Sequence, residues 1–256
     1  MRRPVLIAAL LAALLPGAAA AQTAAPAWSG AVVTLGGGPK LQPEWEGSKN
    51  YLIAPFPIVS LRFSVNPFTG EPTSDLGFGV APAFRYLDSR SGGVDKRLRG
   101  TERVDAALEV GAVVDYTLPY ARAFVELRQG FGGHDGIVGD LGVEGILRPA
   151  PGVKVSVGPR LSFADDDYMD TYFSVSPKVA GRTNFSRYEA DAGIKSYGAG
   201  ARIDWDFNPH WLVRLDGTWN RLTGDAAKSP IVRRAGDRDQ FTLGLGAAYR
   251  FGIDGK

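Results

Sequence analysis

Cysteine is absent from the 256 residues of the sequence. Disulfides and metal sites built on thiolates are therefore excluded. Histidine is scarce, with 2 residues, and a disordered chain is excluded because 45% of the residues are hydrophobic. Glycine is plentiful instead, since the 33 glycines are roughly twice the usual share. Glycine destabilises a helix interior by about 1 kcal/mol relative to alanine, so the surplus belongs in turns or strands.

The N-terminal segment has the composition of an export signal. Arg2-Arg3 precedes an apolar stretch over residues 5–15, and Ala19-Ala20-Ala21 gives a small-x-small cleavage pattern. We therefore predict a cleaved Sec signal peptide over residues 1–21 and a mature protein over residues 22–256. Loss of the two arginines leaves as many basic as acidic residues, which gives no indication of nucleic-acid binding.

No apolar run long enough for a transmembrane helix follows the signal. What recurs is an alternation in which every second residue is apolar, clearest over residues 103–116, 153–163 and 241–251. A period of two over these lengths indicates strands with one apolar face. The expected strands span residues 28–36, 51–64, 74–87, 102–116, 120–130, 137–148, 153–164, 192–207, 210–222 and 238–251. The second carries Pro55 and Pro57, which predict a distortion or bulge.

A soluble β-sandwich and a transmembrane barrel share this alternation. The barrel is favoured because the polar face is rich in small residues, and because tight turns alternate with long polar loops. Aromatic residues also collect at strand ends, where interfacial girdles belong. These aromatic residues are Trp28, Tyr116, Trp205, Phe207, Trp211, Trp219, Tyr249 and Phe251.

We therefore predict an all-β fold, a transmembrane antiparallel up-and-down β-barrel of about ten strands with both termini in the periplasm. Short periplasmic turns are expected at residues 66–73, 117–119, 149–152 and 208–210. Long external loops are expected at residues 36–50, 88–101, 165–191 and 223–237. Residues 168–176 also alternate, and they leave open a projecting hairpin or an extra strand pair that would make twelve strands.

Charged residues of both signs occupy the alternate strand positions whose side chains are expected to point into the barrel, named here the inward parity. They are Arg103, Asp105, Glu109, Asp115, Arg122, Glu126, Arg128, Asp140, Glu144, Arg148, Lys154, Arg160, Arg202, Asp204, Asp206, Arg214, Asp216 and Arg250. Cross-strand pairing can neutralise such charges, which favours a structural ion-pair lattice over a selective pore. Because aqueous porins use about sixteen to eighteen strands, a ten-stranded barrel filled in this way is expected to be plugged.

Glycines occur on the same inward parity. We assign Gly111, Gly142, Gly158, Gly198, Gly200, Gly244 and Gly246 to it. The prediction is that the interior of the barrel has no room for larger side chains at these positions.

Two groups of polar residues are candidates for chemistry. The densest acidic cluster consists of Asp165, Asp166, Asp167 and Asp170. We favour a solvated or arginine-paired loop over a bridge to divalent cations or lipid A, because the EF-hand spacing is absent. His134-Asp135 lies between glycines and predicts an external turn rather than an acid–base site. His210 is expected at the interface.

A nucleophile motif of the Gly-x-Ser-x-Gly type does not occur in the sequence. We therefore predict that the protein is not an enzyme, with no catalytic residues and no cofactor.

Several stretches resemble the MipA/OmpV family of outer-membrane proteins, named for MltA-interacting protein. They are residues 45–48 (WEGS), 128–140 (RQGFGGHDGIVGD), 158–161 (GPRL), 164–173 (ADDDYMDTYF), 208–211 (NPHW), 224–232 (GDAAKSPIV), 239–241 (DQF) and 249–251 (YRF). The resemblance implies a barrel in the outer membrane. It also implies a scaffold that brings a murein lytic transglycosylase together with a penicillin-binding murein synthase, although other members are regarded as surface antigens or adhesins.

The expected partners are outer-membrane lipid, lipopolysaccharide and, through the resemblance, these two murein enzymes. The short periplasmic turns offer little surface for them, since a specific interface needs about 800 Å² per partner. An external adhesin or antigen and a narrow channel for a solute such as an antibiotic are therefore retained as alternatives.

Overall fold

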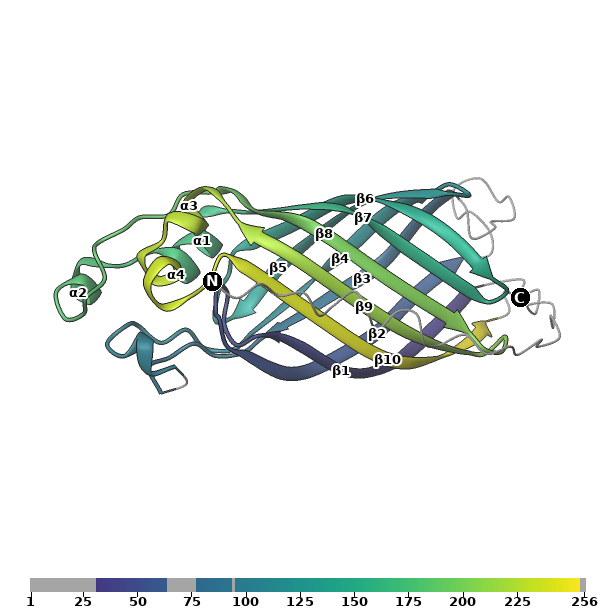
Figure 1. Cartoon of the computed structure of the whole chain (residues 1–256), viewed down its shortest axis with the longest axis horizontal. Coiled ribbons are helices and arrows are strands. Elements are labelled where there is room, and N and C mark those ends of the chain that lie inside the picture. The colour runs from purple at the N-terminus through teal and green to yellow at the C-terminus, as the bar shows by residue number, and fades with distance from the viewer. Residues whose placement is uncertain (1–30, 64–76, 94, 254–256) are drawn as a thin grey trace, which may run out of the picture.

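The computed structural model describes residues 31–63, 77–93 and 95–253 of the chain. The strands in this part form one barrel (Figure 1). The signal peptide predicted for residues 1–21, the aromatic Trp28 and the turn expected at residues 66–73 lie outside the described residues.

Ten strands pair in one antiparallel sheet with the order β2-β1-β10-β9-β8-β7-β6-β5-β4-β3. The strands are β1 Ala31–Pro43, β2 Tyr51–Phe63, β3 Gly77–Leu87, β4 Ala107–Thr117, β5 Ala121–Gly132, β6 Ile137–Ala150, β7 Val153–Ala164, β8 Gly193–Asp206, β9 Trp211–Leu222 and β10 Asp239–Ile253. The first strand pairs with the last, so the up-and-down order predicted from the alternation is confirmed.

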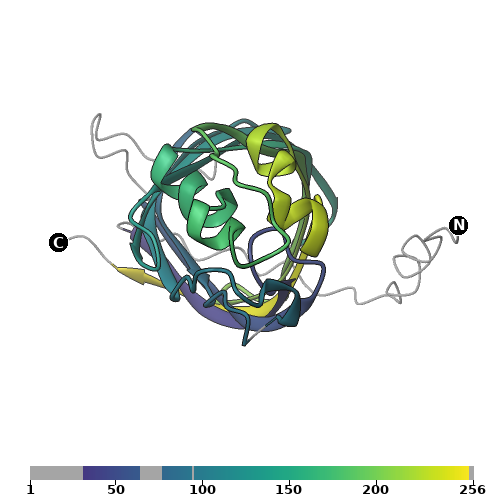
Figure 2. The same cartoon turned by 90° about the vertical axis from the view of Figure 1, so that its left-hand side faces the viewer.

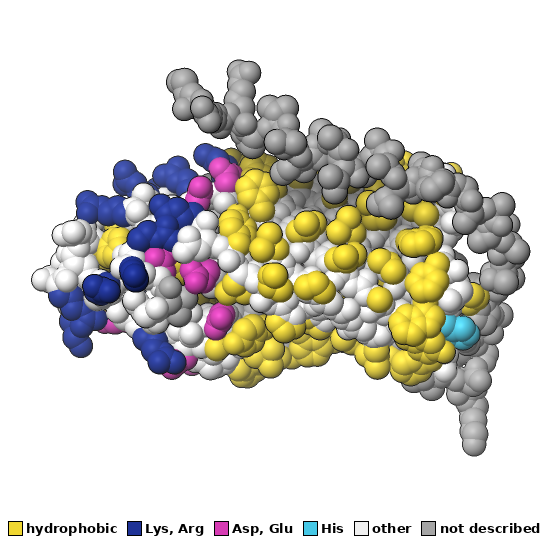
Figure 3. All heavy atoms as spheres, turned by 60° about the horizontal axis from the view of Figure 1, so that its bottom comes forward, with side chains coloured by type: hydrophobic (Ala, Val, Ile, Leu, Met, Phe, Trp, Pro, Cys, Tyr) yellow, Lys and Arg dark blue, Asp and Glu magenta, His cyan; other side chains and the backbone are white. Residues whose placement is uncertain are grey.

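The alternation places apolar side chains on the outside of the barrel. On β4, Leu108, Val114 and Tyr116 are exposed, whereas Glu109 and Asp115 between them are buried. Exposed apolar side chains of this kind form a broad band around the middle of the molecule on the face that Figure 3 shows. Such a band is unfavourable in water and is the surface that a bilayer solvates.

Strand β1 is longer than predicted. It continues to Pro43, although the alternation predicted its end at residue 36 and a loop from there to residue 50. The run Gly36-Gly37-Gly38 hides the period of two, because it has no side chains to alternate. These glycines are needed where β1 approaches β10: a Cβ at Gly38 would lie 2.0 Å from the carbonyl oxygen of Leu245.

Strand β2 carries its two prolines without a bulge. Its register with β1 is continuous from Tyr51 to Phe63, so the expected distortion at Pro55 and Pro57 is absent from this ladder. The reason is the position of β2 at the end of the strand order, where β3 lies beside it. Among the described residues no ladder joins β2 to β3, and a strand paired on one side tolerates residues that lack a donor.

The long connections are not featureless loops. They contain η1 Lys96–Leu98, α1 Asp166–Phe173, α2 Pro177–Ala180, α3 Gly224–Lys228 and α4 Pro230–Ala235. The alternative of twelve strands is therefore wrong, because most of the segment at residues 168–176 is helical. Within the described part of the chain, no helix is long and apolar enough to cross a membrane.

Candidate functional site

The two ends of the barrel differ in construction. At one end, named here the turn end, tight turns join β4 to β5, β6 to β7 and β8 to β9, and the start of β1 pairs with the end of β10. At the other end, four long connections fold over the mouth of the barrel. We name these connections the cap, and they are residues 44–50, 88–106, 165–192 and 223–238. Short periplasmic turns and long external loops are the layout of outer-membrane barrels, and this layout predicts that the cap faces outward.

The four connections of the cap share a hydrophobic core. One cluster of buried side chains joins Trp45 of the first connection to Leu98 of the second, Val175 and Phe185 of the third, and Ile231 of the fourth. Indole, aliphatic and phenyl groups from distant parts of the sequence are thus removed from water together, which stabilises a folded cap rather than separate loops.

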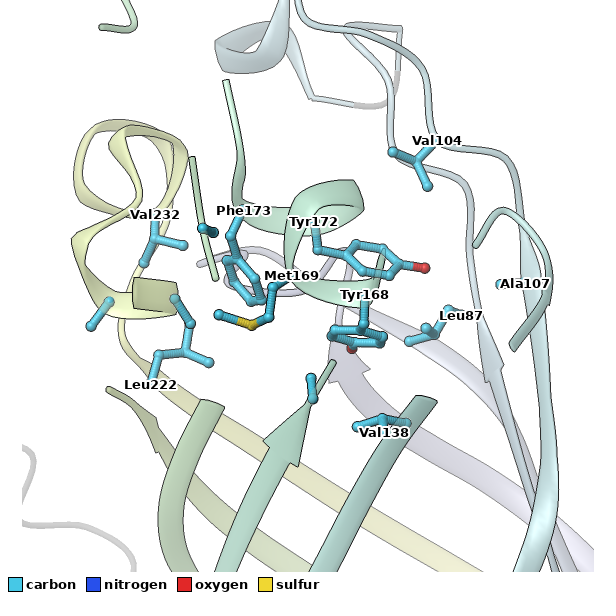
Figure 4. Close-up of a cluster of buried hydrophobic side chains, with 14 residues drawn as sticks. Leu87, Val104, Ala107, Val138, Tyr168, Met169, Tyr172, Phe173, Leu222 and Val232 are labelled. Carbon is cyan, nitrogen blue, oxygen red and sulfur yellow. The ribbon is translucent and has the colours of Figure 1, made fainter. Parts of the chain in front are cut away.

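Helix α1 closes the mouth. Its side chains Tyr168, Met169, Tyr172 and Phe173 are at most 2% exposed. Figure 4 shows the two tyrosines on the side of β3, while Met169 and Phe173 point toward α3 and α4. In the view onto the cap, the helices lie inside the outline of the barrel (Figure 2). The spacing of four residues between Tyr168 and Tyr172 puts both on one helix face.

An ion-paired cluster beneath α1 ties the cap to the strands. The carboxylate of Glu46 accepts hydrogen bonds from Lys195 of β8 at 2.6 Å and Arg85 of β3 at 2.8 Å. The same Lys195 donates to the Tyr168 hydroxyl at 3.3 Å. Burial alone would raise the pKa of Glu46, but the charges of Lys195 and Arg85 outweigh it and lower this pKa to about 2.

A second cation holds the other end of α1. The buried guanidinium of Arg90 donates to the carbonyl oxygens of Tyr172 at 2.5 Å and Thr171 at 3.0 Å. Burial lowers the pKa of Arg90 to about 10, which leaves the group charged at neutral pH. A cation at a helix C-terminus is favourable, because the last carbonyls carry partial negative charge.

The lumen below the cap is filled by charged side chains, as the inward parity predicts. In the upper layer Arg128 contacts Glu109 and Asp140 at 2.8 Å each, and it also pairs with Glu126. The Asp140 carboxylate accepts a further hydrogen bond from Ser162 at 2.6 Å. Each of these groups comes from β4, β5, β6 or β7, so cross-strand pairs compensate the loss of hydration.

A middle layer is centred on Glu144. Its carboxylate contacts Arg122 at 3.2 Å and Arg160 at 2.9 Å, and Arg122 also reaches Asp115 at 3.2 Å. Both guanidinium groups lie over the ring of Phe124, with centroid distances of 5.1 and 5.4 Å. This aromatic ring points into the lumen and adds cation–π contacts to the ion pairs.

The remaining pairs lie on β8 to β10. Arg202 contacts Asp216 at 3.0 Å, Arg214 contacts Asp204 at 2.6 Å, and Arg250 contacts Asp206 at 2.8 Å. Lys154 of β7 lies 3.7 Å from Asp204. Arg148 is exposed and donates to the carbonyl oxygen of Pro119 instead, so it does not belong to these layers.

Two further residues predicted for the lumen also lie elsewhere. Arg103 and Asp105 precede β4, which begins at Ala107 rather than at residue 102, and they are 71% and 70% exposed. They pair with each other at 2.6 Å on the cap surface. The alternation continues N-terminal to β4, and this is why parity alone placed them inside the barrel.

The residues that join the cap to the lumen were not predicted from the sequence. Arg85 lies on the inward parity of β3 and could have been found from the alternation of that strand. Lys195 could not, because the register shift beside Ser162 and Phe163 turns it inward against the parity of β8. Glu46 belongs to a loop, where no periodicity applies.

The acidic cluster lies at the start of α1 and contributes its N-cap. Asp165 is the N-cap and accepts hydrogen bonds from the amides of Tyr168 and Ile137, while Asp166 accepts one from the amide of Ala192. Asp167 and Asp170 are exposed. No group of three or more His, Cys, Asp or Glu residues suited to a metal ion is found among the described residues.

The two histidines have different surroundings. His134 does not project outward from its turn: its side chain is buried, lies 3.5 Å from Glu109, and meets the rings of Tyr168 and Tyr172 edge-on. His210 lies at the turn end and stacks on Tyr249.

The predicted interfacial aromatic residues fall at both ends of the apolar band. At the turn end, Trp205, Trp211, Tyr249 and Phe251 are exposed on the outside of the barrel. Trp219 lies near the cap, where its indole donates to Asp239 at 3.0 Å.

An antiparallel barrel of ten strands with an apolar exterior and a charged interior defines a transmembrane β-barrel. The chain belongs to the family described as MltA-interacting protein MipA, whose model matches residues 35–251.

Curated relatives agree with this family. Outer membrane protein Omp26La of Vibrio anguillarum is 32% identical over 91 residues, which are 36% of this chain and 34% of the relative. Outer membrane protein OmpV of Vibrio cholerae serotype O1 is 33% identical over 91 residues, with the same shares. The matched chain thus spans about a third of the length of these relatives. The protein is an outer-membrane protein.

Among solved structures, an outer membrane channel from Pseudomonas putida F1 has a TM-score of 0.42 to this chain at 14% identity. The match covers 86% of this chain and 94% of the other.

Proposed function

We propose that this protein is a closed, non-enzymatic outer-membrane barrel that acts by presenting its cap to molecules outside the cell. The observation that carries the proposal is the position of α1. Tyr168, Tyr172 and Phe173 fill the mouth, and paired charges fill the lumen beneath them. The apolar band contacts outer-membrane lipid, while the folded cap provides the large polar surface of the molecule.

Conductance in planar bilayers tests closure. The purified, folded protein is expected to give no steady single-channel current, because α1 and the charged layers leave no continuous water path. A variant in which residues 166–191 are replaced by a short Gly-Ser linker removes α1 but keeps the charged layers, so it tests whether α1 is needed for closure. Steady channels of equal size in the wild type and in this variant would refute closure and favour the narrow solute channel.

A second candidate is the murein scaffold, and the description of the matching family as MltA-interacting supports it. Contact with a murein lytic transglycosylase and a penicillin-binding murein synthase would have to use the turn end. In the turn between β4 and β5 at that end, Leu118 and Tyr120 are apolar groups that are 49% and 80% exposed. This surface is small beside the roughly 800 Å² per partner of a specific interface.

Affinity capture tests the scaffold. The folded barrel is incubated with the two purified murein enzymes, and Leu118→Asp/Tyr120→Asp is compared with Leu147→Asp, a change on the exposed apolar face of β6. The scaffold role requires capture that is lost in the double variant alone. Absence of enrichment with the wild type leaves the cap as the contact surface.

A further inference from the structure

A groove at the outer tip of the cap is lined by basic residues. It lies between η1, the segment after α2 and α4, and has a volume of about 720 Å³. We name it the tip groove and define it by its five cations. They are Lys96, Arg97, Arg99, Arg182 and Arg234. In the part of the chain that the structure describes, no carboxylate lines the groove.

Most of these charges are not neutralised within the protein. Arg97 is paired with Asp95 at 2.8 Å. Among the described residues, the other four cations of the tip groove have no acidic partner within ion-pair distance. Two exposed bases elsewhere on the cap are neutralised, since Lys228 pairs with Asp225 and Arg187 with Glu189. Four cations without an acidic partner therefore line a single groove of the cap.

Two of the guanidinium groups are positioned by backbone acceptors. The Nε atom of Arg182 donates to the carbonyl oxygen of Gly100 at 2.7 Å, and Arg234 donates to the carbonyl oxygen of Asn184. A carbonyl oxygen holds a guanidinium without cancelling its charge, so the remaining N–H groups stay available for an anion. This fixed orientation reduces the entropy lost when a ligand binds.

The groove is separated from the membrane. α2 lies at the far end of the molecule, beyond the other helices of the cap (Figure 1). In Figure 3 the basic side chains gather at this end, and acidic groups lie between them and the apolar band. The unpaired cations therefore face the sugars and the medium beyond the lipid surface.

We propose that the tip groove binds a saccharide chain that carries phosphate or sulfate esters. Arginine recognises these groups through paired N–H donors, and several cations within one groove match an anion that repeats along a chain. The volume accommodates a few sugar units, in the range of small-ligand sites. The proposal rests on the proposed contact role and names its ligand class. The source is either the phosphorylated core of lipopolysaccharide or a sulfated glycan from outside the cell.

The experiment uses the full-length, folded protein in nanodiscs free of lipopolysaccharide. The probes are a heparin octasaccharide, the same octasaccharide without its sulfates, and core oligosaccharide with and without its phosphates. Binding is measured by calorimetry at two salt concentrations. We expect the esterified form of at least one pair to bind at least tenfold more tightly than its stripped form, with affinity falling as salt rises. The pair that responds identifies the source.

Charge-matched variants locate the site. Arg182→Gln/Arg234→Gln is expected to weaken binding at least tenfold. Arg187→Gln/Lys228→Gln removes the same charge outside the tip groove and is expected to leave the affinity within twofold. Equal losses in both variants, or equal binding of esterified and stripped saccharides, would overturn the proposal. Conductance of the same samples separates this outcome from failure of the closed-barrel role, since that role predicts no current whether or not a saccharide binds.

Discussion

Glu46 is the residue through which the first loop of the cap is bound to the barrel wall. Its pKa is lowered from 4.5 to about 2 by Lys195 and Arg85, despite burial. A carboxyl whose pKa is depressed in the folded state stabilises the protein above its unfolded pKa. This stabilisation is lost as the pH falls from about 4.5 toward about 2.

The pH dependence of unfolding tests this ion pair. Glu46→Gln is expected to lose up to about 3 kcal/mol of unfolding free energy at neutral pH, and the difference from wild type should shrink between about pH 4.5 and pH 2. Denaturant titration in micelles at several pH values provides the measurement. Glu189→Gln, at an exposed carboxylate, serves as the control. A deficit that stays constant over this range would show that Glu46 acts by packing alone.

The inward glycines give a second prediction at the scale of single residues. A Cβ at Gly244 would lie 2.9 Å from the ring of Phe56, and one at Gly246 would lie 2.8 Å from Ile58. We expect Gly244→Leu/Gly246→Leu to block barrel assembly, since overpacking costs about 1–3 kcal/mol per site. Ala247→Leu changes the residue after Gly246, on the exposed face, and should assemble normally. Heat-modifiable migration on gels distinguishes folded from unfolded protein, and normal folding of the double variant would contradict a filled lumen.

The alternation of side chains along each strand accounts for the lumen residues that the sequence could predict. It placed Glu109, Arg128 and Glu144 in the lumen, because a strand must alternate its faces. It could not place Lys195, where a register shift breaks the period, or Glu46, which has no strand neighbours.

At the scale of elements, α1 shows where periodicity is ambiguous. Residues 168–176 alternate, which suggested a strand, yet Tyr168 and Tyr172 are also four residues apart, as a helix requires. Local hydrogen bonds at the start of the segment favour the helix. The Asp165 side chain accepts hydrogen bonds from the amides of Tyr168 at 3.0 Å and Ile137 at 2.7 Å. In the sequence Asp165 is one of four clustered aspartates, and this clustering conceals the helix start.

The capping role predicts a difference between two aspartates of the cluster. Asp165→Ala is expected to cost about 1 kcal/mol and to speed hydrogen exchange of the α1 amides, because it removes an N-cap. Asp167→Ala changes an exposed residue of the same turn and should have little effect. Hydrogen exchange of the α1 amides is measured by mass spectrometry in wild type and in both variants, with and without a chelator. Faster exchange on adding the chelator to wild type would instead support a bound divalent cation.

At the scale of the whole molecule, the two ends of the barrel carry different surfaces, and the apolar band between them fixes the position in the bilayer. The sequence predicted this sidedness from the lengths of the connections. It did not predict that the long connections form one folded cap, because the cluster of Trp45, Phe185 and Ile231 joins residues far apart in the chain. Contacts of this kind have no local signature.

The sidedness predicts how trypsin acts on living cells. Lys178, Arg182 and Arg187 are exposed on the third connection of the cap, so trypsin added to intact cells should cut the protein there. Arg122 and Arg128 lie within the barrel wall and face the lumen, and they should remain uncut even after the envelope is opened. Peptide mapping of the membrane-embedded fragment locates the cuts. The fragments should stay together in a heat-modifiable barrel, because the strands are joined by ladders that the cuts do not touch. Cleavage on the third connection only after the envelope is opened would show the opposite orientation, with the cap in the periplasm. The murein scaffold would then have the larger surface that the turn end does not offer.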